Sequence, residues 1–546
     1  MEDIHDNKKI SKLLNKISKY KLKLEKINNK SKKSKLDEYR IKTINEKISL
    51  YNDLLETYKE PDEKGKISRA LIKEMHRRNQ ILYGNITQTI IAICLPLAIY
   101  AMFNSFYSLL DSIMAAQIKN TATQSGAINI SNIAVVSQIK GMIQAFGAGI
   151  AGGGAVLVSR YYGAGKHNDA RKTASNMTLV SLITSAIIII LLVPLASVIL
   201  KVAQVPHISS SVILYFRLIL VELVFVSINN IFIGLEKIKG NSKKILVLNI
   251  SVLIIKLILN IIFVFGIKVD SIIYLEIATF VSQLFLFTYG LSVMFSKKNM
   301  LKISFKYMRP TSIYIIPILK LSIPIFLGKF VMSLGKTTVN ALCGSFYGEA
   351  TNGLIVGALG VSNHLSGLVT NTTNVFEEGE STIVSQNIGN KNLDRTLKTF
   401  VRTLMIVAII SSIGFILVRF IFIDELSSLF NTGTDDAIMA TYIKEIFVFD
   451  SLSIPSLGLT SALLGLLYGY GKTFLSSILN FSRIGIRILS LIVCHNIGLD
   501  YKAAGISMGV SNILIGLLAL TFLIIFIINL KKKGYNGLYI TKKEVN

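Results

Sequence analysis

Five acidic side chains occur inside long apolar runs of this sequence. They are Asp111 in Ser-Leu-Leu-Asp-Ser-Ile-Met, Glu377, Glu378 and Glu380 in Phe-Glu-Glu-Gly-Glu, and Asp450 in Phe-Asp-Ser-Leu-Ser. Inserting an ionised side chain at the centre of an apolar helix into a membrane costs about 2.5–3.5 kcal/mol, so such a residue indicates a functional site by default. A carboxylate that faces a water-filled cavity can hold a small cation or a proton. We therefore predict that these five acids couple the movement of a cation or proton, with Asp111 as the first choice.

Each of these acids also has a structural interpretation. The alternative for Asp111 is a carboxylate at a helix end that faces water. The alternative for the three glutamates is a charge-paired core, with partners from two other apolar runs. One candidate pair of partners is Lys329 and Lys336, which share one helix face. The other is Arg483 and Arg487, which lie four residues apart.

Other polar and aromatic residues in the apolar runs are candidates for a substrate cavity. Aromatic faces attract organic cations, amides form hydrogen bonds, and histidine titrates near neutral pH. The alternative for each is ordinary packing in the interior. Glu222 and Arg217 lie in one run and are predicted to pair locally. The predicted cavity residues are Phe103, Tyr107, Asn260, Lys329, Lys336 and His364.

The composition places these residues in a membrane protein. Of 546 residues, 51% are hydrophobic and only 17% are charged, and the mean hydropathy is +0.55. A soluble protein carries about 25% charged residues. No nucleophile paired with a base, phosphate-binding loop or CxxC pair occurs, and the three cysteines lie in or beside apolar runs. We expect no enzyme, no metal site and no cofactor.

Twelve long apolar segments are predicted to cross the membrane. A bilayer core about 30 Å thick needs roughly 20 apolar residues, and backbone groups in lipid must be paired within the segment, so each is a helix. The segments are 88–116, 131–159, 173–203, 210–236, 245–267, 270–296, 312–344, 352–388, 398–424, 437–469, 473–497 and 502–530.

Lysine and arginine lie almost entirely on one side of this arrangement. They follow every even-numbered segment, whereas the intervening loops are nearly free of them. By the positive-inside rule, we expect both termini to lie in the cytoplasm. We expect the protein to be located in the cell membrane. This bias accounts for much of the net charge of +27, so we expect membrane lipids and no nucleic acid as partners. The basic loops are 160–172, 237–244, 297–309, 391–402, 472 and 531–533.

The two halves of the membrane region repeat one another. Landmarks recur at a separation of 226 to 229 residues, which corresponds to six helices. We predict an all-α polytopic membrane protein of two pseudo-symmetric six-helix lobes, residues 83–300 and 301–532, with a cavity between them. Residues 533–546 form a cytoplasmic tail. The landmark pairs are Pro96 and Pro324, Val158 and Val384, Gly240 and Gly469, and Val281 and Val510.

Residues 1–82 form a separate basic helical extension. Apolar residues from Ile10 to Ile27 are spaced alternately three and four apart, and the spacing returns from Ile44 to Tyr58. This pattern predicts a coiled-coil-like antiparallel hairpin on the cytoplasmic side. The alternative is a basic arm that holds anionic lipid or nucleic acid.

Several of these landmarks resemble motifs of the multidrug and toxic compound extrusion (MATE) family, in the flippase-like exporter superfamily. The first segment contains Leu95-Pro96 and then Phe106-Tyr107-Ser-Leu-Leu-Asp111. The second ends in Val158-Ser-Arg-Tyr-Tyr-Gly-Ala-Gly165, and the eighth in its sister form Val384-Ser-Gln-Asn-Ile-Gly389-Asn-Lys. The resemblance covers roughly residues 85–530. It implies a structural role in the family's motifs for Pro96, Gly163, Pro324 and Gly389.

The resemblance implies a Na⁺- or H⁺-coupled antiporter that works by alternating access. It would export amphipathic, often cationic organic compounds, act as a monomer and need no cofactor besides the coupling ion. One branch of the family uses an acidic residue in the seventh helix, where this chain has Lys329 and Lys336. Two alternatives remain: a flippase for lipid-linked oligosaccharides or lipid precursors, and a membrane-anchored scaffold that acts through the N-terminal hairpin.

Overall fold

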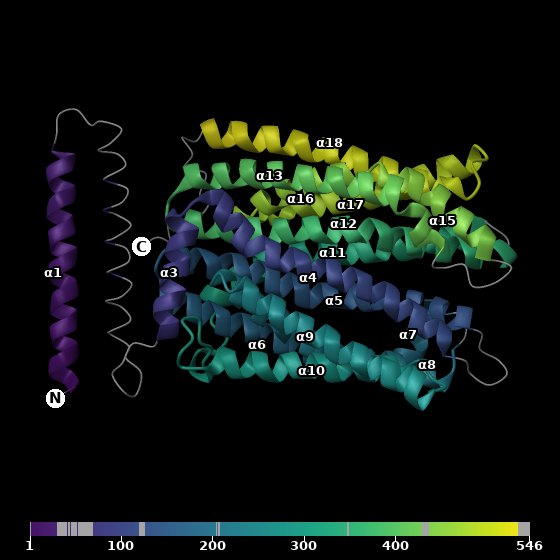
Figure 1. Ribbon diagram of the computed structural model, residues 1–546, viewed down its shortest axis with the longest axis horizontal. Coiled ribbons are helices and arrows are strands. Elements are labelled where there is room, and N and C mark those ends of the chain that lie inside the picture. The colour runs from purple at the N-terminus through teal and green to yellow at the C-terminus, as the bar shows by residue number, and fades with distance from the viewer. Residues whose placement is uncertain are drawn as a thin grey trace.

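The computed structural model describes residues 2–29, 69–118, 126–203, 205, 208–346, 349–428 and 436–532, together with residues 41, 44, 48 and 52. Within these ranges every regular element is a helix. The long helices run side by side along the longest axis of the molecule (Figure 1). The short helix α3 (Arg69–Tyr83) lies across one end of this bundle, which we call the α3 end.

The first lobe contains six long helices, each of which matches a predicted segment. A short helix, α7 (Ala196–Val202), follows the third of them. The fifth ends in a π-helical turn (Ile262–Ile267). The six are α4 (Ile86–Gln117), α5 (Gly126–Gly163), α6 (His167–Leu192), α8 (Ser210–Ile238), α9 (Ser242–Ile261) and α10 (Ile273–Phe295).

The second lobe repeats this order. A 3-10 turn (Phe305–Tyr307) precedes it, a π-helical turn (Leu417–Ile421) ends α13, and a short α14 (Ile423–Ser428) follows. The long helices are α11 (Ser312–Phe346), α12 (Glu349–Gly389), α13 (Leu393–Ile416), α15 (Asp436–Ser451) with α16 (Ile454–Gly469), α17 (Thr473–Asn496) and α18 (Lys502–Lys532).

The predicted count of twelve spans agrees with these helices. Ten described helices are long and apolar enough to cross a membrane, and α15 with α16 forms one more span bent by 49°. Pro455 occupies the first turn of α16, directly after the bend, a position at which proline cannot continue the preceding helix. The twelfth is α12, a helix of 41 residues that includes the three glutamates and many other polar side chains. Pro96 and Pro324 lie inside the continuous helices α4 and α11.

The two lobes meet mainly along three pairs of helices. Helix α5 packs on α11 and on α12, and α4 packs on α12. A buried apolar cluster joins Ile90, Cys94 and Ala98 of α4 to Phe376 and Ile383 of α12. The outer faces carry exposed apolar side chains such as Ile190, Phe420 and Leu489, which is the surface that lipid covers in a membrane protein.

The N-terminal extension is described in part. Helix α1 (Glu2–Asn28) lies outside the bundle, beyond α3 (Figure 1). Ile17 on its predicted apolar seam is buried, and Tyr20, Leu24 and Ile27 are half-buried. The segment predicted to pair with this seam lies mostly outside the described residues, so the coiled-coil hairpin stays a prediction.

Candidate functional site

Asp111 lies in a polar group between α4 and α9. Its carboxylate forms an ion pair with the Lys256 ammonium and accepts a hydrogen bond of 3.0 Å from Asn260 Nδ2. Asn260 also donates to Tyr107 Oη at 2.8 Å, and Lys256 Nζ lies 4.7 Å from the centre of the Tyr107 ring. The structure thus brings three predicted site residues together and adds Lys256. The Asp111 side chain is 29% exposed, so it is neither at a free helix end nor sealed from water.

A second group of buried charges lies in the same lobe. Lys140 of α5 forms ion pairs with Glu222 of α8 at 2.6 Å and with Glu276 of α10 at 3.5 Å. Both glutamates are almost fully buried. The predicted local pair of Glu222 with Arg217 is wrong, because the side chain of Glu222 points across the helix interface to Lys140.

These two groups form one electrostatic cluster. Both Glu222 and Glu276 contact Lys140, and the charges of Lys256 and Glu222 act on Glu276. Among the described residues the cluster holds three carboxyl groups, of Asp111, Glu222 and Glu276, and two lysines. When all are ionised, it carries one uncompensated negative charge, which one proton or small cation neutralises.

A cavity of about 730 Å³ opens next to this cluster, between the first lobe and helices α11 and α12. Seven carboxamide side chains line it, whereas Lys329 is the one charged residue of its lining among the described residues. Tyr100, Ser333 and apolar residues from glycine to methionine in size complete the wall. The seven carboxamides are Asn104, Gln144, Asn229, Asn230, Asn249, Gln283 and Asn371.

The cavity and the charge cluster are successive layers along the same helices. Asp111 follows Asn104 by seven residues, and Lys256 follows Asn249 by seven. Glu276 precedes Gln283 by the same number on a helix of opposite direction. Residues seven apart share one helix face and lie about 10 Å apart along the axis. The cluster therefore lies one layer further from the α3 end than the cavity.

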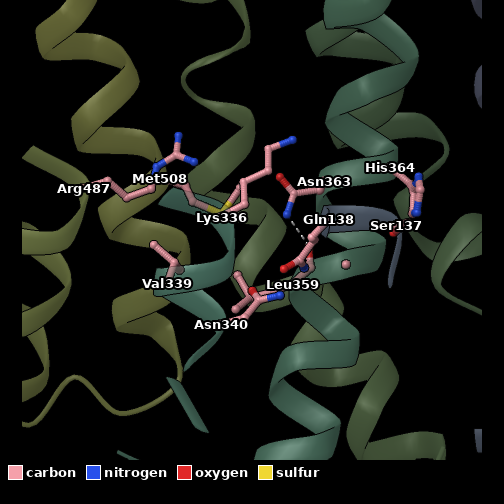
Figure 2. Close-up of a pocket in the computed structure, with 11 residues that line it drawn as sticks. Ser137, Gln138, Lys336, Val339, Asn340, Leu359, Asn363, His364, Arg487 and Met508 are labelled. Atoms are coloured by element: carbon pink, nitrogen blue, oxygen red, sulfur yellow. Dashed lines mark hydrogen bonds between the residues drawn. The ribbon is translucent and has the colours of Figure 1, made fainter. Parts of the chain in front are cut away.

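The second lobe contains a smaller cavity of about 150 Å³. Figure 2 shows Lys336, His364 and Arg487 around it, with Gln138 of the first lobe closing one side. Asp450 is buried nearby and accepts a hydrogen bond from Ser366 Oγ. The charges of Lys336 and Arg487 act on Asp450. Asp450, Lys336 and His364 thus lie in one region, separate from Asp111.

The three glutamates of α12 have different surroundings. Glu378 forms an ion pair of 2.6 Å with Lys237 of α8 in the other lobe, which was not predicted, and the charge of Lys329, one of the predicted partners, also acts on it. Glu377 is half-buried and close enough to Lys329 for their charges to interact. Glu380 is fully buried, and neither carboxyl oxygen has a hydrogen-bond partner among the described residues. The ion pair favours the structural interpretation for Glu378, whereas Glu380 has no charged partner among the described residues and is not part of a charge-paired core.

The lobes are in direct backbone contact at the α3 end. A Cβ atom on Gly163 of α5 would lie 2.6 Å from Gln386 Cα, and one on Gly389 of α12 would lie 2.9 Å from the Arg160 carbonyl carbon. Gln386 Nε2 donates to the Ile238 carbonyl oxygen at 2.8 Å. The repeated motif thus places its two glycines where one lobe touches the other.

Helix α3 contacts both lobes at this end. The Arg78 guanidinium donates to the carbonyl oxygens of Tyr162 and Gly163 at 2.8 and 2.9 Å. These carbonyls lie in the last turn of α5, where helix carbonyls need donors from outside the helical ladder. In the other lobe, Arg395 Nε donates to the Ile81 carbonyl oxygen at 3.1 Å. The α3 helix is therefore part of the membrane domain's packing, although the sequence prediction assigned it to the separate extension.

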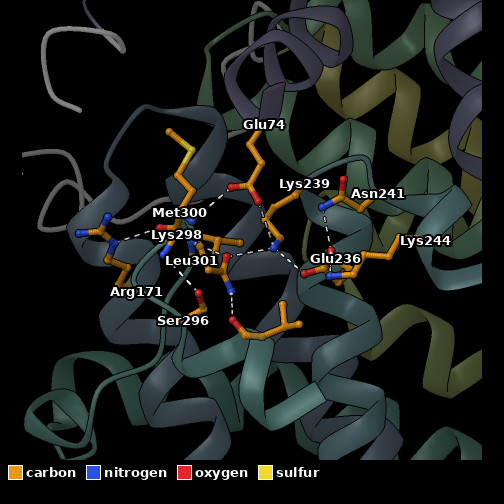
Figure 3. A network of polar contacts seen from close by, with 12 residues as sticks. Glu74, Arg171, Glu236, Lys239, Asn241, Lys244, Ser296, Lys298, Met300 and Leu301 are labelled. Carbon is orange, nitrogen blue, oxygen red and sulfur yellow. Dashed lines mark hydrogen bonds and ion pairs between the residues drawn. The ribbon is translucent and has the colours of Figure 1, made fainter. Parts of the chain in front are cut away.

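A polar network fixes α3 to the loops of the first lobe (Figure 3). Glu74 accepts a hydrogen bond of 3.2 Å from the Met300 amide and lies 3.4 Å from Lys239 Nζ. Lys239 also contacts Glu236 at 2.5 Å. Burial raises the pKa of the Glu74 carboxyl group, while Lys239 opposes this shift.

The repeat seen in the fold also appears in the comparison with known families. The MatE family model matches residues 96–262 in the first lobe and 324–493 in the second, together more than half of the chain. This chain belongs to the MatE family of membrane transporters. Among curated proteins, none matches its sequence.

Solved MATE structures share this fold at low sequence identity. A crystal structure of MATE in complex with MaL6 matches with a TM-score of 0.74 and 16% identity, over 83% of this chain and 99% of that chain. A MOP superfamily transporter from Pyrococcus furiosus Vc1 matches with a TM-score of 0.75 and 16% identity, over 83% of this chain and 98% of that chain. That transporter is described as having a binding pocket of reverse polarity, which suggests a different function for it. An outward-facing multidrug resistance MATE transporter matches at 0.73, with the same identity and coverages.

In this MatE protein the predicted site residues are divided among several places. Lys329 lines the larger cavity, and Lys336 and His364 line the smaller one. Phe103 is exposed on α4 and lines neither.

Lys140, Glu276 and the carboxamide wall were not predicted from the sequence. Lys140 and Glu276 are charged residues inside apolar runs, which is the signal that could have found them.

Proposed function

We propose that this protein is a cation-coupled exporter of amphipathic organic compounds that acts by alternating access in the cell membrane. Membership of a transporter family supports the general activity. The observation that carries the coupling is the cluster of three acids and two lysines, because its uncompensated charge provides one exchangeable cation site. The adjacent cavity is the proposed substrate site, and its volume is in the range typical of drug-sized ligands.

In this proposal the α3 end faces the cytoplasm. Arg171, Lys239, Lys244 and Lys298 lie together at this end (Figure 3), which agrees with the positive-inside rule. The contacts at Gly163 and Gly389 keep the lobes closed there. Taking up substrate from the cytoplasm therefore requires these contacts to separate, and release on the other side requires them to form again.

The proposed coupling step occurs at Asp111. In the structure Lys256 occupies its carboxylate. A proton that binds Asp111 removes the charge that holds Lys256, and the ammonium can then shift toward Glu276, whose charge already interacts with it. This exchange changes the packing of α9 against α4 and gives the two access states different affinities for the cation.

The test is transport by the purified full-length protein in liposomes with an imposed pH or Na⁺ gradient. For each probe that the wild type moves, D111N should abolish the dependence of transport on the gradient. D394N is the matched control, because it removes an exposed acid whose one ion pair among the described residues is with Lys398 at the surface. Gradient-driven transport that is unchanged in D111N would contradict the assignment of Asp111.

A flippase for lipid-linked oligosaccharides or lipid precursors is the second candidate. The observation that favours it is the pair of basic residues, Lys336 and Arg487, on the smaller cavity. Gradient-independent movement of a lipid, without transport of small dyes, would support this activity over export.

The scaffold alternative is tested by deleting residues 2–60. This deletion leaves α3 in place, since α3 contacts both lobes. An exporter should retain transport without these residues.

A further inference from the structure

The larger cavity differs from a site for organic cations in the chemistry of its wall. Cations are held by carboxylates or by aromatic faces. Among the described residues, the lining contains no carboxylate, and Tyr100 is its one aromatic residue. The charged group that it does present is the Lys329 ammonium, which repels a cation.

The carboxamides of the wall have hydrogen-bonding capacity that the protein does not use. Asn104, Gln144 and Asn230 form no hydrogen bond with other described residues. Asn229 donates to Gln283 Oε1 at 2.9 Å, but its own Oδ1 atom is buried without a partner, and the side chain is 2% exposed. Buried polar atoms are normally paired, so the Asn229 Oδ1 atom requires water or a ligand as its partner. The exposed Asn104 amide and the half-buried amides of Gln144 and Asn230 are open to a ligand.

A carboxamide offers a donor and an acceptor side by side. A hydroxyl group offers the same two functions and can therefore bridge neighbouring amides. A wall with many carboxamides is thus complementary to a molecule with several hydroxyl or carbonyl groups. A purely apolar molecule would leave the same amides unpaired, at a cost of about 1–3 kcal/mol for each buried group.

Lys329 adds a preference for one negative charge. It forms no ion pair with the described residues, and its side chain is exposed to the cavity. Glu377 and Glu378 are both close enough to interact with it electrostatically, but the charge of Arg483 acts on Glu377 as well. Lys237 neutralises Glu378. The ammonium is therefore available to a ligand.

We infer that the substrate of this cavity is a small, hydroxyl-rich organic molecule that carries one negative charge. The inference rests on the proposed export function and names the substrate class for it. The amides would bind the hydroxyl groups, and Lys329 would bind the anionic group. The same chemistry is found in a free acidic glycoside and in the headgroup of an acidic glycolipid.

The test compares two glycosides that differ only at C6, which is a carboxylate in one and a hydroxymethyl group in the other. 4-Methylumbelliferyl β-D-glucuronide and its β-D-glucoside share the ring system and most hydroxyl groups, but only the glucuronide is an anion. Ethidium serves as the cationic probe. Transport into liposomes and equilibrium binding to the purified full-length protein are measured for each probe. Competition by dodecyl β-D-glucuronide distinguishes a lipid-borne substrate from a free one.

The wild type should bind the glucuronide about tenfold more tightly than the glucoside, and ethidium least. K329Q should remove the preference for the glucuronide and leave glucoside binding within twofold. The matched control is K320Q, on the same helix but on neither cavity. The double variant Q144L/N230L should weaken both glycosides about tenfold, and N496L, at the exposed end of α17, should weaken neither.

Two results would overturn the inference. One is tighter binding of ethidium than of either glycoside. The other is a ratio of glucuronide to glucoside affinity that K329Q does not change. If no probe, ethidium included, moves under any gradient, the proposed export function fails, while the binding measurements still decide the substrate class independently.

Discussion

The contact between Gly163 and Gly389 gives a direct test of how the lobes close. The perturbation is a single methyl group, G163A or G389A. Neither glycine has a positive φ, and both end a helix, so alanine is compatible with the local backbone. Any effect must therefore come from the partner lobe.

The size of this effect follows from the distances. The new Cβ on residue 163 would lie 2.6 Å from Gln386 Cα, against about 3.4 Å for ordinary contact. The obstructing atoms are backbone atoms, which cannot rotate away as a side chain can. Overpacking costs about 1–3 kcal/mol, and the upper half of this range corresponds to a shift of about 30- to 150-fold in the ratio of closed to open states.

The assay measures the distance between the lobes at the α3 end. Spin labels replace Lys166 and Asp394, which are both exposed, in a background without the three native cysteines. G163A and G389A should each shift the distribution to longer distances and lower the rate of transport. G485A, whose Cβ would have no neighbour within 4 Å, is the control. Unchanged distances in both variants, or an equal shift in G485A, would refute the reasoning.

Three further substitutions test the ion pairs. K140M should lower the melting temperature because it leaves two buried carboxyl groups without their cation, and E222Q should restore part of the loss; no recovery would contradict the shared ion pair. A double-mutant cycle of K237Q and E378Q should show coupling of about 1 kcal/mol, whereas zero coupling would exclude a stabilising bridge. The raised pKa of Glu74 means that its stabilising contribution, present below pH 4.5, is lost as the pH rises. The melting temperature of E74Q relative to wild type should therefore increase with pH, and a constant difference would contradict this.

The sequence by itself determined the fold of the membrane region. Twelve long helical segments and the six-helix repeat were predicted, and the helices and the match of the family model to both halves agree with them. Ten of the described helices, or eleven with the bent pair, are apolar enough to cross a membrane, and the third predicted segment joined α6 to the separate helix α7. The physical reason is that these features are local. Each span must be apolar over about 20 residues and must pair its own backbone, whatever its neighbours are. Gly163 was also predicted as a structural motif position, and the structure shows why a glycine is needed there: the backbone of the other lobe leaves no room for a Cβ atom.

Only the tertiary structure decided which charges meet. Asp111 pairs with Lys256, 145 positions away, and Glu378 with Lys237, 141 positions away in the other lobe. Glu222 contacts Lys140 and not its neighbour Arg217. These outcomes depend on the rotation and packing of whole helices, which the hydropathy of a single helix does not specify. For the same reason the carboxamides of six different helices became a single cavity wall only when the helices were assembled.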